Sequence, residues 1–579
     1  MPETVDAANR PVSQPGRLDL AQRAADLERM RTETFDIVVI GAGSTGTGAA
    51  LDAASRGLRV ALVEARDFAA GTSSRSSKLI HGGLRYLEQF EFGLVREALR
   101  ERSLLLNTIC PHLVRPVSFL MPLKNRFWER PYIGAGLVLY DGLGGAKGLR
   151  RHRHLSKRGA LKVAPGLRQD ALIGAIQYQD CKVDDARHTL TVARTAAQYG
   201  AAVASNAPVV GFLRESGRVT GVRVQDRHTG DEIDVAAREV INATGVWTDD
   251  VQDLVGERGK FKVRASKGIH LVVPRDRIQL DTGLILRTEK SVLFVIPWGR
   301  HWIIGTTDND WDLDKAHPAA SATDIDYVLG HVNKVLASPL THEDVEGVYA
   351  GLRPLLAEEN EGTSQLSREH SVASPAPGLV SVAGGKYTTY RVMGRDAVDA
   401  AVRGLDEKVP PSATQVTPLV GAEGYRVLWN QRARLARESG LHVERIEHLL
   451  GRYGSAIHDL LDEVRREPEL GKPLEGADDY LRVEVRYAAS HEGALHLDDV
   501  LARRTRISIE TFDRGLASAE PAAALMGEVL GWSDDHRAEQ VDLYRQRVAA
   551  ERDSQTKTDD QAADVARTSV PDFTAVPGT

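Results

Sequence analysis

The chain has 579 residues, a formal net charge of -6 and two cysteines, Cys110 and Cys181. This length exceeds a single ordinary domain, and the negative charge argues against a general nucleic-acid binder. Two cysteines without a CxxC spacing argue against a disulfide scaffold and against a metal site, so we expect no metal. No long apolar run and no signal-peptide core occur, which favours a cytoplasmic protein that does not span a membrane.

Residues 1–34 are polar and charged, with a short helical pattern from Leu18 to Met30. Such a composition offers little apolar surface to bury against a domain. We expect this segment to be a flexible N-terminal arm.

A strand, a glycine-rich turn and a helix follow one another over residues 36–54, in the order of a dinucleotide-binding βαβ unit. Gly41 permits the tight turn, Gly43 lets the backbone approach a pyrophosphate, and Gly46 lets helix and strand pack closely. Glu64 ends the next strand, 18 residues after Gly46, a spacing that suits a carboxylate on ribose hydroxyls. The predicted nucleotide-binding residues here are Gly41, Gly43, Ser44, Thr45, Gly46 and Glu64.

Residues 71–87 combine serines, glycines and cations in an irregular loop that can wrap an anionic ligand. A plain surface loop is the alternative, although it would not need Ile80, Leu84 and Leu87 between the cations. The candidates for cofactor contacts are Thr72, Ser73, Ser77, Lys78, His81 and Gly82.

Two later segments place cations beside aromatic residues, at Lys124 to Tyr132 and at Lys147 to Arg158. Such a surface suits anionic lipid headgroups, with Trp128 and Tyr132 at the interface. A solvated face explains the composition equally well. From Gly174 onward the pattern changes to short strands, broken by a helix that runs to Gly200 and by two hairpin turns.

An apolar strand at residues 239–244 runs into Gly245, which fits a strand that returns beside the nucleotide site. His270 lies in another apolar strand, where a hydrogen-bonded core histidine is the usual interpretation. Two glycine-and-cation turns follow at 350–355 and 383–391, and the second opens a helix. It adds Gly385, Lys386 and Thr388 to the cofactor candidates.

Proline-rich residues 408–418 mark a linker, residues 419–550 show helical periods typical of a helical domain, and residues 551–579 are polar and weakly patterned. We expect the last segment to be a disordered tail.

The motifs GAGSTG, SSKLIHGGLRYLE, DDAR, NATGVW, KGIHLVVP, IGTTD, GLRPL, GGKYTTYR and LARRTR occur in this order. In this set the chain resembles the FAD-dependent sn-glycerol-3-phosphate dehydrogenase family of respiring bacteria and mitochondria. The resemblance implies an α/β flavoprotein with a Rossmann-type FAD-binding domain of the D-amino-acid-oxidase and glutathione-reductase type. It also implies an antiparallel substrate sheet, mainly at 262–345 within an oxidoreductase region at 35–407, and a C-terminal helical domain.

The reaction implied by this resemblance is the oxidation of glycerol 3-phosphate to dihydroxyacetone phosphate, with electrons passed from FAD to membrane quinone. His270 takes the role of general base by this resemblance, since a near-neutral pKa can accept the hydroxyl proton. A phosphate dianion calls for guanidinium donors, for which Arg85, Arg353 and Arg391 are candidates, with Tyr86 as a neutral donor. Lys386 is expected near the flavin or the substrate oxygen.

The predicted catalytic residues are therefore His270, Arg353, Lys386 and Arg85, and the substrate-binding set adds Tyr86 and Arg391. Tyr387 and Val246 depart from residues common in relatives, but their flanking glycines and hydroxyl residues are retained. The resemblance implies a protein bound peripherally to the inner face of the cell membrane through an anionic lipid surface, and leaves a homodimer open. An oxygen-using glycerol-3-phosphate oxidase, an amino-acid or amine oxidase of the same fold, and a non-catalytic flavin-binding protein remain alternatives.

Overall fold

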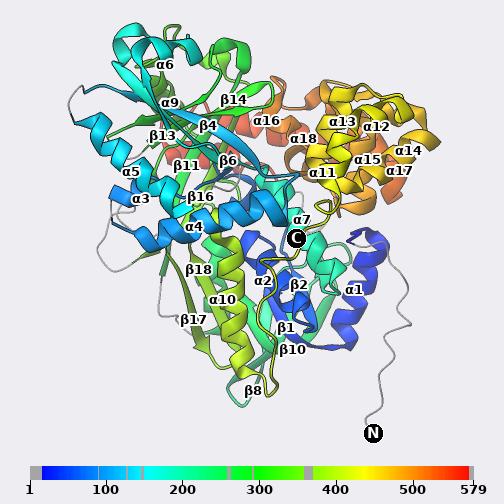
Figure 1. The fold of residues 1–579 in the computed structure, drawn as a ribbon. Helices are drawn as coiled ribbons and strands as arrows, with labels where there is room; N and C mark the ends of the chain where they lie inside the picture. Colours follow the sequence, from blue (N-terminus) through cyan, green and yellow to red (C-terminus); the bar gives the residue numbers. More distant parts are fainter. Residues whose placement is uncertain are drawn as a thin grey trace.

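The computed structural model describes residues 16–88, 90–125, 128–144, 149–256, 262–289, 292–357 and 369–572. Figure 1 shows one sheet at the bottom, a second sheet at the upper left and a group of helices at the upper right. The two sheets alternate along the chain, because segments far apart in the sequence contribute strands to each. None of the helices in the described ranges is long and apolar enough to cross a membrane.

The first sheet has eight strands and the predicted Rossmann-type centre. Its order is β17-β18-β10-β1-β2-β7, with β9 paired to β10 and β8 paired to β9. The strand predicted to return beside the nucleotide site is confirmed, since β10 pairs in parallel with β1. The strands are β1 (Thr34–Ile40), β2 (Val60–Val63), β7 (Ala202–Ala204), β8 (Val209–Glu215), β9 (Arg218–Gln225), β10 (Glu232–Asn242), β17 (His370–Ala376) and β18 (Leu379–Gly384).

Three helices cover one face of this sheet, namely α2 (Ser44–Ser55), α7 (Asp185–Gln198) and α10 (Tyr390–Ala401). Their contact surfaces are rich in alanine and glycine, which allows helices to approach closely. Gly394 of α10 shows this directly, because an added Cβ would lie 2.6 Å from the backbone of Gly48 in α2. The far downstream helix α10 is thereby held against the nucleotide-binding helix (Figure 1).

The second sheet has ten strands in the order β15-β11-β14-β13-β12-β4-β6-β3, with β16 beside β11 and β5 beside β6. It extends beyond the predicted range of 262–345, because β3 to β6 and β16 belong to it. Pro116 and Pro122 make β4 hard to predict from sequence, because proline has no backbone N–H to donate to a neighbouring strand. The strands are β3 (Leu79–Ile80), β4 (Arg115–Leu123), β5 (Arg153–Ser156), β6 (Gly174–Lys182), β11 (Lys262–Pro274), β12 (Gly283–Arg287), β13 (Val292–Trp298), β14 (His301–Gly305), β15 (Asn309–Trp311) and β16 (Gly347–Ala357).

Helices also flank the second sheet and link it to the first. They are α3 (Arg85–Glu88), α4 (Phe92–Leu104), α5 (Glu129–Gly144), α6 (Lys157–Val163), α8 (Thr248–Val255) and α9 (Ala322–Asn333). Buried residues of α6 and α9 pack on the apolar side chains of β11 and β14 and form a core of their own. The second sheet therefore has a hydrophobic core separate from that of the first.

The C-terminal domain is helical, with one short hairpin of β19 (Pro473–Leu474) and β20 (Ala477–Leu481). Ile446, Leu449 and Leu450 recur at helical spacing and lie in a core with the neighbouring helices. The helices are α11 (Tyr425–Asn430), α12 (Arg432–Ser439), α13 (Val443–Tyr453), α14 (Ile457–Arg466), α15 (Arg482–His491), α16 (Ile507–Glu510), α17 (Leu516–Leu530) and α18 (Asp534–Ser554).

The described part of the N-terminal segment is ordered, which corrects the expectation of a flexible arm. Helix α1 (Leu20–Thr32) packs on β7 and buries Leu27 and Met30. The buried Asp26 accepts a hydrogen bond from the Val203 N–H at 3.0 Å, which satisfies a donor of the edge strand β7. This partner lies far along the chain, so the polar composition alone could not reveal it. Residues 1–15 lie outside the described ranges.

The predicted disordered tail is also wrong as far as residue 572. Helix α18 continues to Ser554, and α19 (Asp560–Arg567) follows and buries Ala563. Besides the apolar contact of Ala563, polar contacts dock this segment: the Ala322 N–H donates to Lys557 O at 2.7 Å, and Lys267 Nζ lies 2.5 Å from Asp560 Oδ1. Residues 573–579 lie outside the described ranges.

Buried neutral histidines predict a loss of stability in mild acid. Burial is the main cause that lowers the pKa of five histidines to values between about 3 and about 4. They are His81, His112, His188, His228 and His491. These groups bind protons in the unfolded chain near pH 6.5 but not in the folded chain, so stability falls as the pH drops below 6.5. Thermal unfolding should show a clearly lower Tm at pH 5.5 than at pH 7.5. An unchanged Tm would contradict neutral burial of these rings.

Candidate active site

A cleft of about 740 Å³ opens between the carboxyl ends of β1 and β2 and the second sheet. Clefts of this size at the end of a parallel sheet are typical sites for a cofactor and its substrate. Most of the predicted site residues line it: Gly41, Gly43, Ser44, Thr45, Glu64, Thr72, Ser73, Ser77, His81, Tyr86, Gly245, His270, Arg353, Gly385 and Lys386.

The glycine turn between β1 and α2 has the backbone geometry that a dinucleotide pyrophosphate requires. Gly41 has a φ of +97°, and a Cβ there would lie 3.0 Å from Ala243 O. Gly43 precedes α2 without a side-chain cap, so the helix N-terminus remains open to a phosphate. Gly46 does not line the cleft; a Cβ on it would lie 1.8 Å from Gly41 O, so it serves the close helix–strand packing expected from the motif. These residues fit FAD.

Glu64 lies at the end of β2 and holds the glycine turn. Its Oε2 accepts a hydrogen bond from the Ala42 N–H at 2.7 Å, and its Oε1 accepts one from the Arg66 N–H at 2.9 Å. Burial raises the pKa of this carboxyl, and the two backbone donors oppose that effect. The position at the cleft is the one expected for a ribose-binding acid, and that role stays a prediction.

The serine-rich loop folds back over the start of α2. The Ser44 N–H donates to Ser73 Oγ at 2.9 Å, and Thr72 Oγ1 donates to Leu352 O at 2.5 Å. Ser77 lines the cleft, and its Oγ also lies 2.8 Å from His270 Nε2, so its predicted cofactor contact stays a prediction. The loop therefore connects the cofactor cradle to the predicted general base.

Three predicted cofactor contacts support the wall of the cleft rather than line it. Lys78 is fully buried and donates to Asp185 Oδ1 at 2.8 Å and to Ser74 O at 3.0 Å. The Gly82 N–H donates to the Tyr140 hydroxyl at 2.8 Å, and Thr388 Oγ1 accepts from the His81 N–H at 3.1 Å. The sequence placed these residues in the correct segments, but strand and turn geometry points them away from the cleft.

Arg391 is also corrected, because it does not reach the cleft. Its Nε and Nη2 donate to the two carboxylate oxygens of Glu101 at 2.7 and 2.6 Å, and the pair is buried. Arg391 follows the glycine turn by less than two helical turns, but the phase of α10 directs it toward α4. The ion pair joins these helices and leaves no role for Arg391 at a substrate.

His270 lies in β11, directly opposite Tyr349 of β16, and the two rings stack at 4.8 Å. Burial, Arg353 and Lys78 together hold its pKa well below the usual 6.5. The imidazole is therefore neutral at physiological pH, and in this environment it is a weaker base than the near-neutral histidine expected from the sequence. A Cβ on Gly305 would lie 2.4 Å from His270 Cδ2, so this glycine makes room for the ring.

Two cations share the cleft with His270. Arg353 Nη1 donates to Asp308 Oδ1 at 3.1 Å, and its Nη2 donates to Thr306 Oγ1 at 3.2 Å, which fixes the guanidinium plane. Lys386 Nζ lies over the Tyr86 ring, 3.4 Å from its centroid. The side chain of Arg85 lies outside the described residues, so its predicted role is untested.

Two residues that support the site were not singled out from the sequence. Tyr349 packs on His270, and Asp308 orients Arg353 and also accepts from Ser266 Oγ. Asp308 is the last residue of the IGTTD motif, which contributed to the family resemblance, but no role was assigned to this acid from the sequence. Tyr349 could be found only from the pairing of β16 with β11, which sequence periodicity does not give.

Comparison with known proteins agrees with this geometry. Residues 36–396 match the family model of FAD dependent oxidoreductases, and residues 412–537 match the C-terminal domain of alpha-glycerophosphate oxidase. Glycerol-3-phosphate dehydrogenase 2 of Mycobacterium tuberculosis is 60% identical over 96% of this chain and 95% of that protein. The chain belongs to the FAD-dependent glycerol-3-phosphate dehydrogenase family.

The similarity to more distant members of this family also covers most of this chain. The human mitochondrial glycerol-3-phosphate dehydrogenase is 37% identical over 92% of this chain and 76% of that protein. A solved structure of the glycerol-3-phosphate dehydrogenase of Bacillus halodurans with FAD is 29% identical, with a TM-score of 0.76 over 92% of this chain and 97% of that one. The expected fold, with its FAD domain, second sheet and helical C-terminal domain, is confirmed.

The glycine turn gives a direct test of cofactor retention. Gly46→Ala should release most of the FAD, because its Cβ would overlap Gly41 O and push α2 away from the turn. Gly330→Ala is the matched control, since nothing lies within 4 Å of a Cβ there. The ratio of flavin absorbance to protein measures the effect. Equal flavin content in both variants would contradict the assigned cradle.

Proposed function

We propose that this chain oxidises glycerol 3-phosphate to dihydroxyacetone phosphate with FAD as the immediate electron acceptor. The observation that carries the proposal is a neutral histidine that shares a cleft with Arg353, Lys386 and a dinucleotide cradle. The relatives named glycerol-3-phosphate dehydrogenase, which cover nearly the whole chain, support this choice of substrate. When bound, FAD supplies the acceptor for the hydrogen and electron pair that leave the C2 carbon.

The hydroxyl proton of the substrate goes to His270 Nε2, the ring nitrogen that lies 2.8 Å from Ser77 Oγ. Nδ1 is buried and makes no hydrogen bond within the described part of the chain, so Nε2 is the nitrogen with a polar environment. The substrate hydroxyl displaces or shares the contact with Ser77. Loss of this proton makes it easier for C2 to give up its hydrogen.

Arg353 and Lys386 hold the phosphate dianion, and Tyr86 is a neutral donor beside them. Arg353 cannot swing away from the cleft without breaking its contacts to Asp308 and Thr306. The dianion also offsets the cationic field that depresses the pKa of His270. Substrate binding therefore makes the imidazole a stronger base at the moment when a base is required.

Membrane quinone is the proposed final acceptor, reached from the bilayer surface. Trp128, Tyr132 and Val138 on and before α5 are 50%, 50% and 63% exposed, and Phe90, just before the neighbouring helix α4, is 78% exposed. Arg150, Arg151 and Arg153 are exposed just after this helix. Exposed aromatic and aliphatic side chains next to arginines suit the interface of an anionic bilayer. Arg126, Phe127 and Lys147 of the predicted patches lie outside the described residues.

The visible spectrum of the purified protein tests the reaction. Anaerobic glycerol 3-phosphate should bleach the flavin absorbance, and an amino acid should not. Rapid reoxidation by a quinone analogue and slow reoxidation by air would distinguish a dehydrogenase from an oxidase. No bleaching with any substrate would support a non-catalytic flavoprotein and defeat the proposal.

His270→Ala should lower the rate of flavin reduction by about 10² to 10⁴-fold, the usual contribution of a general base. Its FAD content should remain normal, because His270 lies in β11 of the second sheet and not in the glycine turn that holds the dinucleotide. His342→Ala, at an exposed position, is the control. Stopped-flow absorbance measures both rates. Near-normal reduction in the His270 variant would remove this residue from the base role.

Charge reversal at Arg150, Arg151 and Arg153 should weaken binding to vesicles that contain anionic lipid, by about 1 kcal/mol for each cation lost near the surface. Reversal of the exposed Arg434, Arg437 and Arg545 in the C-terminal domain is the control for net charge. Vesicle sedimentation measures the bound fraction, while flavin reduction in solution stays unchanged. Equal binding of the two triple variants would exclude the patch beside α5 as the docking surface.

A further inference from the structure

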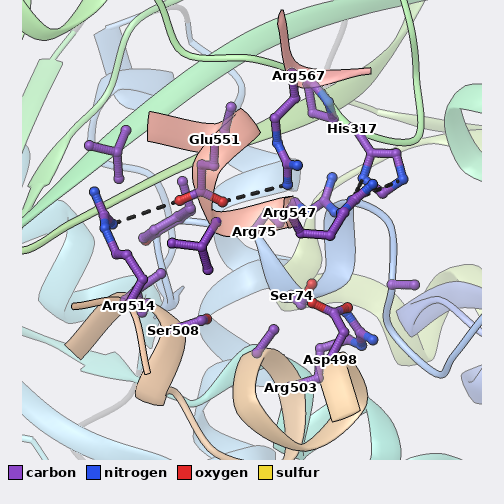
Figure 2. Close-up of a pocket in the computed structure, with 18 of the residues that line it drawn as sticks. Ser74, Arg75, His317, Asp498, Arg503, Ser508, Arg514, Arg547, Glu551 and Arg567 are labelled. Atoms are coloured by element: carbon purple, nitrogen blue, oxygen red, sulfur yellow. Dashed lines mark hydrogen bonds and ion pairs between the residues drawn. The ribbon is translucent and has the colours of Figure 1, made fainter. Parts of the chain in front are cut away.

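A second cavity, of about 130 Å³, lies behind the active-site cleft, among β16, α18, α19 and the segment before α16. Figure 2 shows arginines from separate parts of the chain around this hollow. The cavity adjoins the cleft: residues 348–350 of β16 line the cavity, residues 351–355 line the cleft, and Arg66, Ala70, Arg75 and Asp572 line both. The cavity has room for a compact ion and not for a nucleotide, whose sites are several times larger.

Positive charge dominates the lining within the described part of the chain. Seven arginines face five carboxylates; the arginines are Arg66, Arg75, Arg503, Arg506, Arg514, Arg547 and Arg567, and the acids are Asp67, Asp498, Asp499, Glu551 and Asp572. Most of these ions have partners, such as Arg503 with Asp67 and Asp499. No carboxylate of the described chain lies within ion-pair distance of Arg75 or Arg547: Arg75 donates to Ala316 O at 2.9 Å, and Arg547 contacts only the ring of His317.

Three guanidinium groups at the cavity keep an N–H group without a hydrogen bond. These are the Nη1 atoms of Arg514, Arg547 and Arg567. Arg514 and Arg547 are 5% and 6% exposed, so water outside the protein does not satisfy them. Glu551 is shared between Arg514 at 3.8 Å and Arg567 at 3.5 Å, and neither distance is that of a strong hydrogen bond. Buried N–H donors without a partner at the lining of one cavity favour an acceptor there.

We propose that this cavity binds a small tetrahedral oxyanion, namely a phosphate group, held by Arg514, Arg547 and Arg567. A phosphate dianion matches the excess of positive charge and offers oxygens to several guanidinium forks at once. Serine hydroxyls of Ser74 and Ser508 at the same lining add neutral donors. The site is separate from the proposed substrate position, because Arg514, Arg547 and Arg567 line the cavity and not the cleft, where His270 and Arg353 lie.

The titration behaviour of the lining agrees with this arrangement. Burial, together with Arg66, Arg567 and Arg503, lowers the pKa of Arg75 to about 9. Burial and Arg567 lower the pKa of Arg547 to about 10. Burial also lowers the pKa of His317 to about 2, so this ring is neutral and adds no charge of its own. A bound dianion would relieve the repulsion among these arginines.

Inorganic phosphate and selenate are the probes, added to the FAD-loaded full-length protein at constant ionic strength. Phosphate should raise the Tm of the wild type, and Arg547→Gln should weaken the apparent affinity at least tenfold. Arg545→Gln, exposed on the same helix, is the matched control. Selenate soaked into crystals should give an anomalous peak within hydrogen-bond distance of Arg514 and Arg547. Flavin reduction by glycerol 3-phosphate should stay normal in Arg547→Gln, which separates this site from the proposed reaction.

A second variant, Arg514→Gln, repeats the measurement if Arg547→Gln does not fold. A further titration identifies the source of the phosphate group. Glycerol 3-phosphate is added to His270→Ala and to the double variant His270→Ala/Arg547→Gln, and the rise in Tm of the two is compared. An Arg547-dependent response to inorganic phosphate alone assigns the free ion, and a response to both assigns the head of a phosphate ester. Equal phosphate stabilisation of wild type and both arginine variants, or a selenate peak in the cleft with none in the cavity, would overturn the proposal.

Discussion

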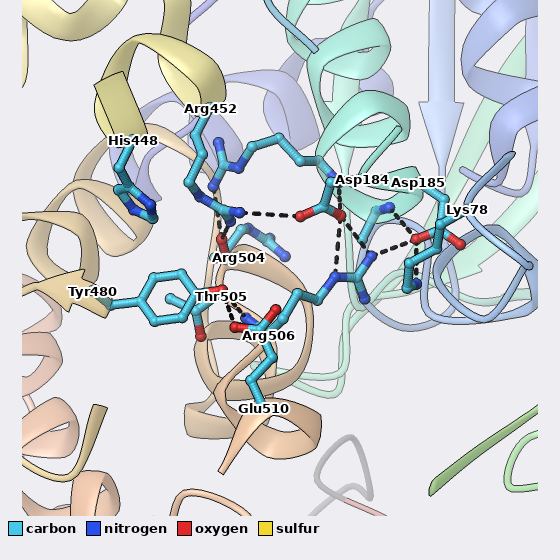
Figure 3. A network of polar contacts seen from close by, with 12 residues as sticks. Lys78, Asp184, Asp185, His448, Arg452, Tyr480, Arg504, Thr505, Arg506 and Glu510 are labelled. Atoms are coloured by element: carbon cyan, nitrogen blue, oxygen red, sulfur yellow. Dashed lines mark hydrogen bonds and ion pairs between the residues drawn. The ribbon is translucent and has the colours of Figure 1, made fainter. Parts of the chain in front are cut away.

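The arrangement of the domains depends on a buried ion cluster around Arg506 (Figure 3). Its Nη2 donates to Asp184 Oδ1 at 2.6 Å and to Asp185, and its Nη1 donates to Ser74 O at 3.2 Å. Arg452 binds the other oxygen of Asp184 at 3.2 Å. Removing one partner of such a buried set leaves an unpaired charge, which costs roughly 3–5 kcal/mol. These buried ion pairs therefore favour the docked arrangement of the C-terminal domain and the FAD domain.

This cluster also sets the geometry of the active site. Asp185 Oδ2 accepts hydrogen bonds from the N–H and hydroxyl of Ser76 at 2.9 and 2.7 Å, while Oδ1 accepts from Lys78. Ser77 lies between these two anchored residues and contacts His270. Lys78 in turn contributes to the field that keeps His270 neutral. An arginine of the helical domain thus positions the partner of the proposed base without touching the cleft.

The sequence predicted most of what is local in this structure. The glycine turn, Glu64 and the helix after the DDAR motif follow from spacing and capping over short stretches, and the structure has each of them. The direction of side chains was less predictable, as Arg391 shows. Its position around the axis of α10 determines whether the guanidinium reaches Glu101 or the cleft, and sequence spacing did not resolve this. The ordered ends were missed for another reason: α1 and α19 bury only a few apolar residues each and also depend on polar contacts to residues far along the chain. Composition reports apolar area and carries no information on such partners.

Tyr349 is the side chain at which the three units of the protein meet. Its ring stacks on His270 at 4.8 Å, Lys78 Nζ lies 4.8 Å from its centroid, and its hydroxyl donates to Ser76 O at 3.0 Å. The loop that Arg506 anchors therefore fixes the ring from one side, and the second sheet fixes it from the other. The same residue lines the arginine-rich cavity. Because a close-packed interior transmits small displacements, the position of this one ring couples the serine-rich loop and the second sheet to the imidazole.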